Sequence, residues 1–282
     1  MNIFVAGASG VIGRSLLPRL IQAGHRVIGM TSQAKNIRMI EETGAQAVVA
    51  DVFDREGIMT VLNDIRPDLV IHQLTSLSNG NTEENAKIRI EGTRNLVDAA
   101  KAAGVQKIIA QSIAWAYEPG NSPAAEDVPL DTGAASPRSV TIKGIVSLEN
   151  AIAEIPQHVI LRYGTFYGPG TWYDSEGMIA AKVKNGELPA SDAVTSFIHV
   201  EDAVQAAIKA LEWPNGAVNI VDDEPAAGKD WLLYYANKLQ APAPVYQEGR
   251  NSWERGASNA KARNIYGWEP NYPTWRLGFE HL

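Results

Sequence analysis

A glycine-rich stretch near the start of the chain has the spacing of a phosphate-binding turn. The residues GASGVIGR place Gly7, Gly10 and Gly13 between an apolar run that predicts a strand and a segment that predicts a helix. The first glycine permits a tight turn, the second lets the backbone approach a pyrophosphate, and the third allows close packing of helix and strand. The amino end of a helix also favours negative charge. The stretch therefore predicts a dinucleotide site, in preference to a glycine-rich turn without a ligand.

The elements that must position this turn alternate regularly. Helical patterns separate short apolar runs, and the runs that predict strands are 2–7, 26–31, 45–51, 68–74, 106–112 and 158–164. Strands that are apolar on both faces indicate a parallel sheet covered by helices on both sides. We predict an α/β fold, a Rossmann-type doubly wound parallel sheet of about seven strands. The expected domains are a dinucleotide-binding domain, 1–164, and a smaller C-terminal substrate-binding region, 165–282, with 196–225 partly returning to the sheet.

Several short motifs follow in order along the chain. They are AD (50–51), VIHQLT (70–75), EGTRNLVDAA (91–100), RYGTFYGPG (162–170), SFIHVEDAV (196–204) and SNAKARNIYGWEP (258–270). With the glycine turn, they resemble the extended short-chain dehydrogenase/reductase superfamily, the NAD(P)-dependent epimerase/dehydratase group, nearly from end to end. The resemblance implies a nicotinamide dinucleotide, a small-molecule substrate, and cofactor contacts from Gly7, Ser9, Gly10, Val11, Ile12, Gly13, Arg14, Ser32, Lys35, Asp51, Val52, Gln73, Leu74, Thr75 and Lys143.

The chain departs from this family at its proton-transfer residues. Family members carry a tyrosine that exchanges a proton with the substrate oxygen, and a lysine four residues later that holds the ribose and lowers the tyrosine pKa. If Lys143 is that lysine, Ser139 stands at the tyrosine position. If Glu149 is the glutamate that often follows eight residues after the tyrosine, Thr141 and Ile145 stand at the tyrosine and lysine positions. Both registers stay open, and neither supplies a tyrosine.

A serine hydroxyl cannot readily replace a phenol, because its pKa lies far above the value of about 10 for tyrosine. Other candidate donors are Tyr117, Tyr163 and Tyr167, which follow or end predicted strands. Tyr117 and Tyr167 have counterparts in ordinary family members, which favours a structural or substrate-lining role. Tyr163 stands where the family usually has proline, and is therefore more informative.

Two further positions differ from the family pattern. Arg89 replaces an asparagine that precedes the Gly-Thr of the helix. The serine or threonine expected four residues before Tyr117 is Ile113, and Ser112 lies one residue earlier. A slip of one residue makes Ser112 the equivalent, where it is expected to orient the substrate oxygen.

The end of the second predicted strand bears on the choice of cofactor. NAD-specific sites usually carry an acid there, whereas this strand ends with Thr31 and Ser32, and Lys35 follows. Lys35 and Arg14 have the charge to attract a 2′-phosphate, so we predict NADP, with NAD as the other possibility. The alternative, that both are solvated surface residues, stays open.

An aromatic-rich C-terminal region offers a substrate wall. Its candidates are Trp172, Tyr173, Trp253 and Arg255, the last able to hold an anionic group. For most of the aromatic residues we favour the alternative, that they pack the core of this region.

The composition limits the function classes. The 282 residues are 45% hydrophobic, carry a net charge of −7 and include no cysteine. These values disfavour a nucleic-acid partner and exclude thiol chemistry. No apolar run of membrane-spanning length or signal-peptide pattern is seen, so we expect a cytoplasmic protein. A homodimer is the candidate assembly.

We predict an NADP-dependent oxidoreductase or epimerase/dehydratase-like enzyme of an atypical type, acting on a small carbonyl or hydroxyl compound or a nucleotide sugar. The candidate catalytic residues are Ser112, Tyr117, Lys143 and Tyr163. The alternative is a dinucleotide-binding sensor or regulator without turnover.

Overall fold

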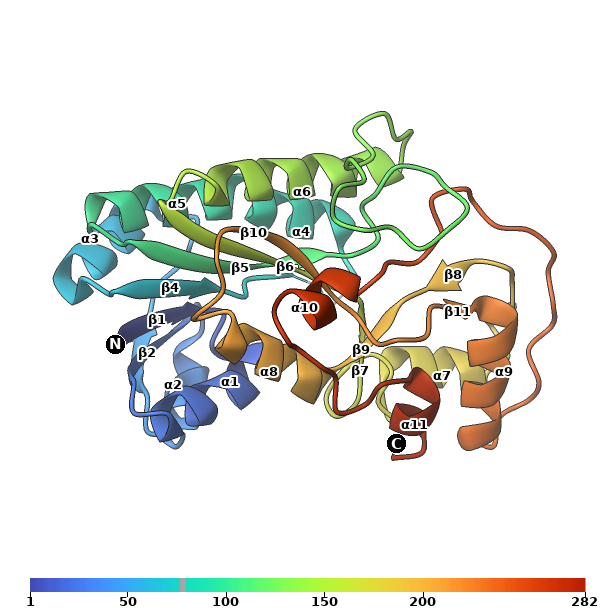
Figure 1. The fold of residues 1–282 in the computed structure, drawn as a ribbon. Helices are drawn as coiled ribbons and strands as arrows, with labels where there is room; N and C mark the ends of the chain where they lie inside the picture. The colour runs from blue at the N-terminus through green and yellow to red at the C-terminus, as the bar shows by residue number, and fades with distance from the viewer. Residues whose placement is uncertain (77–79, 282) are drawn as a thin grey trace. The chain divides into compact units, whose positions relative to one another are not determined.

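The chain folds around a seven-stranded parallel sheet, shown in Figure 1 as a computed structural model that describes residues 1–76 and 80–281. The strand order is β10-β6-β5-β4-β1-β2-β3. From β3 to β6 this is the order of a doubly wound nucleotide-binding fold, so the predicted fold class is confirmed. The strands are β1 (Asn2–Ala6), β2 (Arg26–Thr31), β3 (Gln46–Val49), β4 (Leu69–His72), β5 (Lys107–Ile113), β6 (Gln157–Tyr163) and β10 (Gly216–Ile220).

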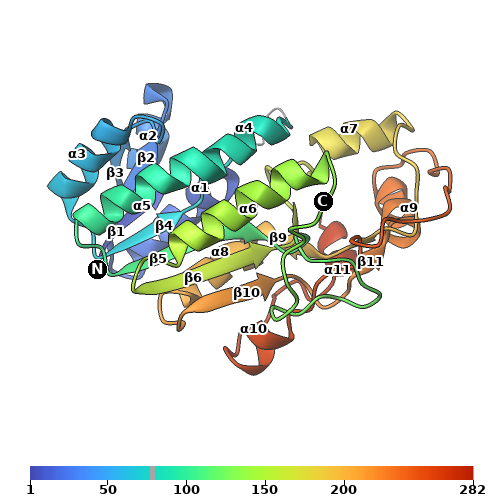
Figure 2. The same cartoon turned by 90° about the horizontal axis from the view of Figure 1, so that it is seen from above.

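Helices cover both faces of the sheet. In Figure 1, α1 and α2 lie on one face, and α3, α5 and α6 lie on the other. Figure 2 shows α6 beside the long helical run formed by α4, η2 and α5, in which η2 is a π-helical turn. The helices that precede β6 are α1 (Val11–Gln22), η1 (Ala34–Asn36), α2 (Ile37–Glu41), α3 (Arg55–Ile65), α4 (Thr82–Lys87), η2 (Ile88–Gly92), α5 (Thr93–Ala102) and α6 (Arg138–Ile152).

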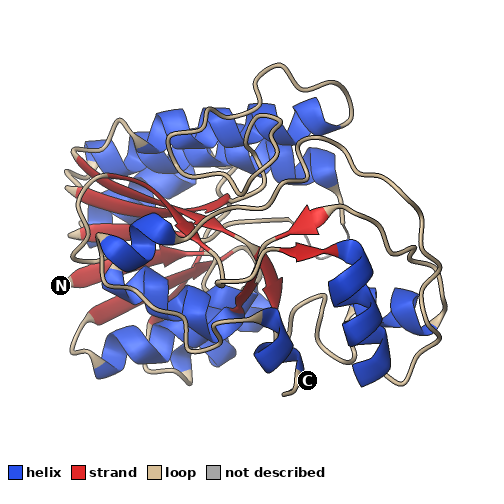
Figure 3. Cartoon of the chain, turned by 45° about the vertical axis from the view of Figure 1, so that its right-hand side comes forward, coloured by secondary structure: helices blue, strands red, loops and turns tan. Residues whose placement is uncertain are grey.

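The later part of the chain has shorter elements. Two pairs of short strands, β7 with β9 and β8 with β11, accompany the helices (Figure 3). The elements are β7 (Thr165–Tyr167), α7 (Met178–Lys184), β8 (Val194–Thr195), β9 (Phe197–His199), α8 (Val200–Lys209), β11 (Ala226–Ala227), α9 (Gly228–Lys238), α10 (Ala260–Asn264) and α11 (Trp275–Phe279).

The chain divides into two compact units that interleave along the sequence, and the expected boundary after residue 164 stays a prediction. The first unit is Met1–Ser112, Thr132–Leu161 and Ala207–Ala217, and the second is Ile113–Asp131, Arg162–Ala206 and Val218–Leu282. The core of the first unit packs apolar side chains of β1, β2, β4 and β5 against α3, α5 and α6. A largely aromatic core in the second unit includes Tyr167, Phe197, Tyr235, Trp275 and Phe279.

Local sequence explains where several helices begin. The Asp54 carboxylate accepts the N–H of Gly57 at 3.0 Å and caps α3, and the Asn81 side chain accepts the N–H of Glu84 at 3.0 Å and caps α4. Within the described ranges, no helix is long and apolar enough to cross a membrane. The same residues include no cluster of histidine, aspartate and glutamate that would hold a metal ion.

Candidate functional site

The phosphate-binding turn joins β1 to α1, and the space around it requires glycine. Gly7 has a φ of 90°, and a Cβ there would lie 2.7 Å from the carbonyl oxygen of Gln73. A Cβ on Gly13 would lie 2.3 Å from the carbonyl oxygen of Gly7. Gly10 directly precedes α1 with extended backbone, and its N–H bonds to Gly7 at 3.1 Å. The turn therefore presents bare backbone beside the amino end of a twelve-residue helix, which suits a phosphate.

The turn lies where the strand order reverses. β1 pairs in parallel with β2 on one side and with β4 on the other. Gln73 directly follows β4, and its carbonyl closes the space over Gly7. Open α/β sheets bind ligands in the crevice at such a switch point.

The helical run from α4 to α5 passes the end of β4 in the opposite direction. Thr93 Oγ1 lies 2.8 Å from His72 Nε2, and Asn85 Oδ1 accepts the N–H of Ser76 at 3.1 Å. The residue number rises from 72 to 76 along one segment while it falls from 93 to 85 along the other, so the two segments run in opposite directions. Arg89, midway between them on the helical run, is therefore level with the segment that directly follows β4.

Two polar side chains are buried there. Gln73 is 5% exposed, and neither atom of its amide has a hydrogen-bond partner. Arg89 is also 5% exposed, and no hydrogen bond or ion pair joins it to another described residue. Burial lowers the pKa of Arg89 to about 10, so its guanidinium stays charged at neutral pH. Because burying a charge or an amide without a partner is costly, both groups fit a ligand that brings hydrogen-bond partners.

The neighbours of Arg89 fix its position. A Cβ on Gly144 of α6 would lie 3.4 Å from Arg89 Cδ, so α6 borders the arginine side chain. Burial, and then the charge of Arg89, lower the pKa of His72 to about 4, which keeps that ring neutral. The guanidinium is therefore the buried positive charge between α6 and the end of β4.

The segment after β3 is also arranged for a ligand. Val52 is buried against Gly92, where a Cβ would come within 2.8 Å of it, and Asn95 Nδ2 donates to the Val52 carbonyl at 2.9 Å. Asp51 is exposed and accepts the N–H of Phe53 at 2.9 Å. Val52 is thus held by packing while Asp51 faces solvent. Together with the turn, Gln73 and Arg89, these residues fit a dinucleotide.

No acid stands at the end of β2. Thr31 is buried, and its hydroxyl lies 3.2 Å from Ser9 Oγ and accepts from Gln33 N and Asn36 Nδ2. Ser32, Lys35 and Arg14 are exposed, and neither cation forms an ion pair within residues 1–76 and 80–281. This end of the strand therefore places no negative charge against a 2′-phosphate.

A buried hydrogen bond ties β5 to α6. Ser112 Oγ donates to Glu149 Oε1 at 2.7 Å, and the two residues are 1% and 8% exposed. Thr141 and Ile145, eight and four residues before Glu149, are buried as well. Residues spaced by four share a helix face, so all three lie toward the interior. The Ser112 hydroxyl thus bonds to a buried carboxylate, and its expected role in orienting a substrate oxygen stays a prediction.

Lys143 and Ser139 lie on another face of α6. Lys143 is exposed, and both residues line an open pocket of about 330 Å³ with Thr132, Ile142, Val146 and Ser147. Neither residue is brought to Ser112 or Glu149. This placement gives no support to the predicted contact of Lys143 with the nicotinamide ribose.

The candidate tyrosines are all buried. The Tyr117 hydroxyl donates to Asn219 at 2.5 Å and accepts from Arg162 at 3.0 Å, while Tyr163 donates to the Ala203 carbonyl at 3.2 Å. Burial, and then the Asp222 carboxylate, raise the pKa of Tyr167 far above its usual value. Packing and hydrogen bonds occupy the hydroxyls of Tyr117 and Tyr163, and their expected proton-donor roles stay predictions.

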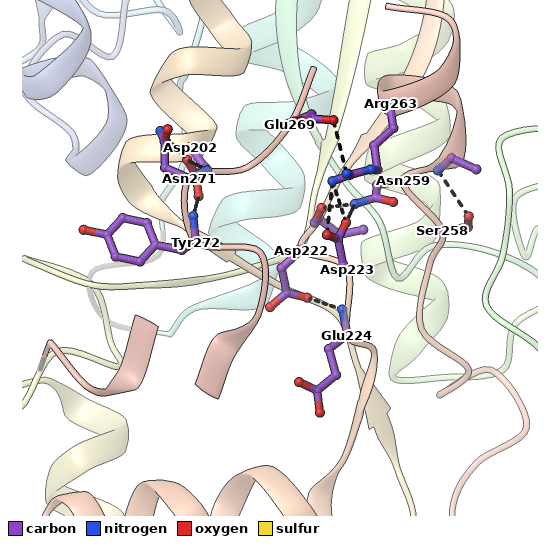
Figure 4. Close-up of polar contacts among 12 residues, drawn as sticks. Asp202, Asp222, Asp223, Glu224, Ser258, Asn259, Arg263, Glu269, Asn271 and Tyr272 are labelled. Atoms are coloured by element: carbon purple, nitrogen blue, oxygen red, sulfur yellow. Dashed lines mark hydrogen bonds and ion pairs between the residues drawn. The ribbon is translucent and has the colours of Figure 1, made fainter. Parts of the chain in front are cut away.

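The polar groups in Figure 4 hold the loops of the second unit. Several belong to the motifs 196–204 and 258–270, but the sequence did not indicate these contacts. The Asp202 carboxylate accepts three hydrogen bonds from Asn271 and Tyr272, at 2.7–2.9 Å. Asp223 binds Asn259 Nδ2 at 2.7 Å and Arg263 at 3.1 Å. These contacts join loops that are far apart in sequence, and we assign them a structural role.

The residues expected to form a substrate wall lie in different surroundings. Tyr173 packs edge-on against Phe197 and Trp231 in the aromatic core, as the alternative interpretation held. Arg255 donates to the backbone carbonyls of Ser122 and Glu118 at 2.6 and 3.2 Å. The arginine thus fastens a loop, rather than standing ready for an anionic group.

Comparison with known proteins agrees with this architecture. A model of the NAD dependent epimerase/dehydratase family matches residues 3–221. A Streptomyces protein, 3-diazoavenalumate denitrifying reductase, is 38% identical over 304 residues, covering 99% of both chains. The UDP-glucose 4-epimerase of Mycolicibacterium smegmatis is 25% identical over 96% of this chain and 94% of its own. The crystal structure of the Thermotoga maritima UDP-glucose 4-epimerase with UDP-glucose has a TM-score of 0.79 and 23% identity, and covers 100% and 98% of the two chains.

Proposed function

We propose that this chain, which belongs to the NAD-dependent epimerase/dehydratase family, is an NADP-dependent reductase that works without a protein proton donor. The observation that carries the proposal is the buried hydrogen bond between Ser112 and Glu149. It supports the register in which Thr141 and Ile145 occupy the tyrosine and lysine positions. In that register Ile113 occupies the position of the active-site serine or threonine.

These replacements remove each step of a proton relay. A threonine hydroxyl is too weak an acid to protonate a substrate oxygen near neutral pH, and isoleucine carries no ionisable group. Reducing a carbonyl, or oxidising a sugar hydroxyl for epimerisation, requires that proton transfer. The remaining chemistry is hydride transfer to a substrate whose leaving group needs no proton.

Replacement of the whole diazonium group by hydrogen meets this condition, because N2 leaves without needing a proton. In an aryldiazonium ion, the hydride forms a new C–H bond, the C–N bond breaks, and its electron pair leaves with N2. The substrate carbon is reduced, the dihydronicotinamide is oxidised, and no proton is consumed. The Streptomyces relative is named for a denitrifying reduction of a diazo compound, so its name supports the same reaction class for this chain.

The chain's own residues would bind and orient the participants. NADPH, when bound, supplies the hydride. The turn at Gly7–Gly13 and the amino end of α1 would hold its pyrophosphate. Gln73 and Arg89 would hold the nicotinamide end, with Arg89 providing the positive charge that Ile145 lacks. A guanidinium suits this role because it binds hydroxyl and carbonyl oxygens without giving up its proton.

The preference for NADP rests on the end of β2. Ser32 and Lys35 follow β2 and are exposed, Arg14 of α1 is exposed as well, and no acid stands at the end of the strand. These three residues would offer a 2′-phosphate hydrogen-bond donors and positive charge.

The test is to incubate the purified protein with NADPH and 3-diazoavenalumate, and to follow NADPH oxidation together with N2 release by mass spectrometry. We expect one N2 per NADPH and slower oxidation of NADH. A matched incubation with NAD and UDP-glucose should yield no UDP-galactose. Tight cofactor binding without turnover of any diazo substrate would refute the proposal and favour the sensor alternative.

A further inference from the structure

An exposed tryptophan follows β5 directly. Trp115 lies two residues beyond the last strand residue and is 41% exposed, although large apolar side chains are usually buried. The half-buried Trp253 accompanies it, with ring centroids 6.5 Å apart and planes inclined by 42°. Two indoles at this separation form a broad aromatic surface that still reaches solvent.

The loop that carries Trp253 is firmly attached. Arg255 donates to the carbonyls of Ser122 and Glu118, and Gly120 N–H bonds to the Ser252 carbonyl at 2.9 Å. A Cβ on Gly120 would lie 2.2 Å from the Arg255 guanidinium, so glycine is required for this arrangement. The loop is thereby braced from both sides, and the Trp253 ring is held before any ligand arrives.

We propose that Trp115 and Trp253 form a stacking subsite for an aromatic ring of the substrate. Residues just beyond the carboxyl ends of parallel strands are where such folds bind ligands. Indole is the side chain with the largest stacking surface, and holding it in place lowers the entropy cost of binding. The subsite accepts a flat aryl acid or aryl diazo compound, and offers no hydrogen-bonding pattern specific for a sugar.

This inference rests on the proposed function in one respect, that the ring belongs to the substrate of the reductase. It makes Trp115 and Trp253 binding residues and makes Gly120 and Arg255 positioning residues. None of the four has a role in hydride transfer.

The experiment measures binding by calorimetry to the NADP+-loaded protein with two probes, cinnamate and 3-cyclohexylpropenoate. They share the propenoate and differ in having a flat or a puckered ring. We expect wild type to prefer cinnamate by about tenfold, and Trp115→Leu and Trp253→Leu to abolish this preference. Trp115→Phe should retain part of it.

Two further variants separate positioning from general damage. Gly120→Ala displaces Arg255 and should lower the preference for the flat ring while NADP+ affinity stays unchanged. Tyr246→Leu removes an exposed aromatic residue elsewhere in the second unit, 51% exposed, and should leave the preference intact.

Equal affinity for the two acids, no cinnamate binding, or an unchanged preference in both tryptophan variants overturns the subsite. So does a loss of self-association in those variants with the ring preference kept, because the pair would then cover a second copy. Intact cinnamate selectivity without diazo turnover would instead refute the proposed function alone.

Discussion

The turn after β1 and the helix α6 have diverged to different degrees from the family pattern. The turn keeps its three glycines. A Cβ on Gly13 would lie 2.3 Å from the carbonyl oxygen of Gly7, so the backbone can approach this closely only without a side chain. On α6, the interior face keeps Glu149 and its bond to Ser112 but carries Thr141 and Ile145 where a relay would stand. We infer that cofactor binding is retained while acid–base chemistry is not. A substrate that needs hydride alone removes the need for the relay.

The largest expected effect tests whether the glycine turn after β1 still binds the cofactor. Gly10→Asp places a carboxylate where we propose the pyrophosphate binds, and should weaken NADPH binding by more than about 100-fold. Aspartate is favourable directly before a helix, so thermal unfolding should not worsen. Gly10→Asn is the matched control, with equal size and capping ability but no charge, and should lose much less affinity. Equal losses in the two variants would argue against a phosphate at this position.

The next effect separates Arg89 from an ordinary structural arginine. Arg89→Leu should weaken NADPH binding by about tenfold, because the buried positive charge is lost. The same change removes a buried charge, so the free energy of unfolding without cofactor should hold or rise. Arg89→Lys keeps the charge and should recover part of the affinity. A variant that unfolds more easily yet binds NADPH normally would assign Arg89 to the fold.

The stability of variants at Ser112 and Glu149 tests the register of α6 in which Glu149 is the family glutamate. Ser112→Ala leaves the buried Glu149 carboxylate without this donor, and should lower the free energy of unfolding by about 1–3 kcal/mol. Glu149→Gln in the same background should restore part of it, since a neutral amide depends less on the lost Ser112 donor than a carboxylate does. Urea unfolding of the four proteins forms a double-mutant cycle. Additive losses would contradict a direct bond.

The smallest effect is expected on the exposed face of α6. Lys143→Ala and Ser139→Ala should change NADPH affinity and turnover by less than about twofold, since both residues line an outer pocket. Steady-state kinetics would check this. A large loss of cofactor affinity in Lys143→Ala would restore the other register and its lysine–ribose contact.

Much of the fold was predictable, because its strands are apolar on both faces. The expected strand 106–112 is observed at Lys107–Ile113, and the expected strand 158–164 at Gln157–Tyr163. The glycine turn was also predictable, because its spacing encodes local geometry.

The rest depends on which way a side chain points. The Tyr117 and Tyr163 residues end or follow strands, yet their hydroxyls turn inward to Asn219 and Ala203. The pairing of Ser112 with Glu149, and of Trp115 with Trp253, joins residues that the sequence keeps far apart. Arg89 was visible as a departure from the family, but its burial without a partner was not.

The solvent deuterium isotope effect on kcat/KM for 3-diazoavenalumate reduction tests the central claim most directly. NADPH deuterated at the transferred position first establishes that hydride transfer limits the rate. If no protein group donates a proton in that step, the ratio of rates in H2O and D2O should be about 1. A ratio of about 2 or more, with hydride transfer still limiting, would show a proton in flight and contradict the account.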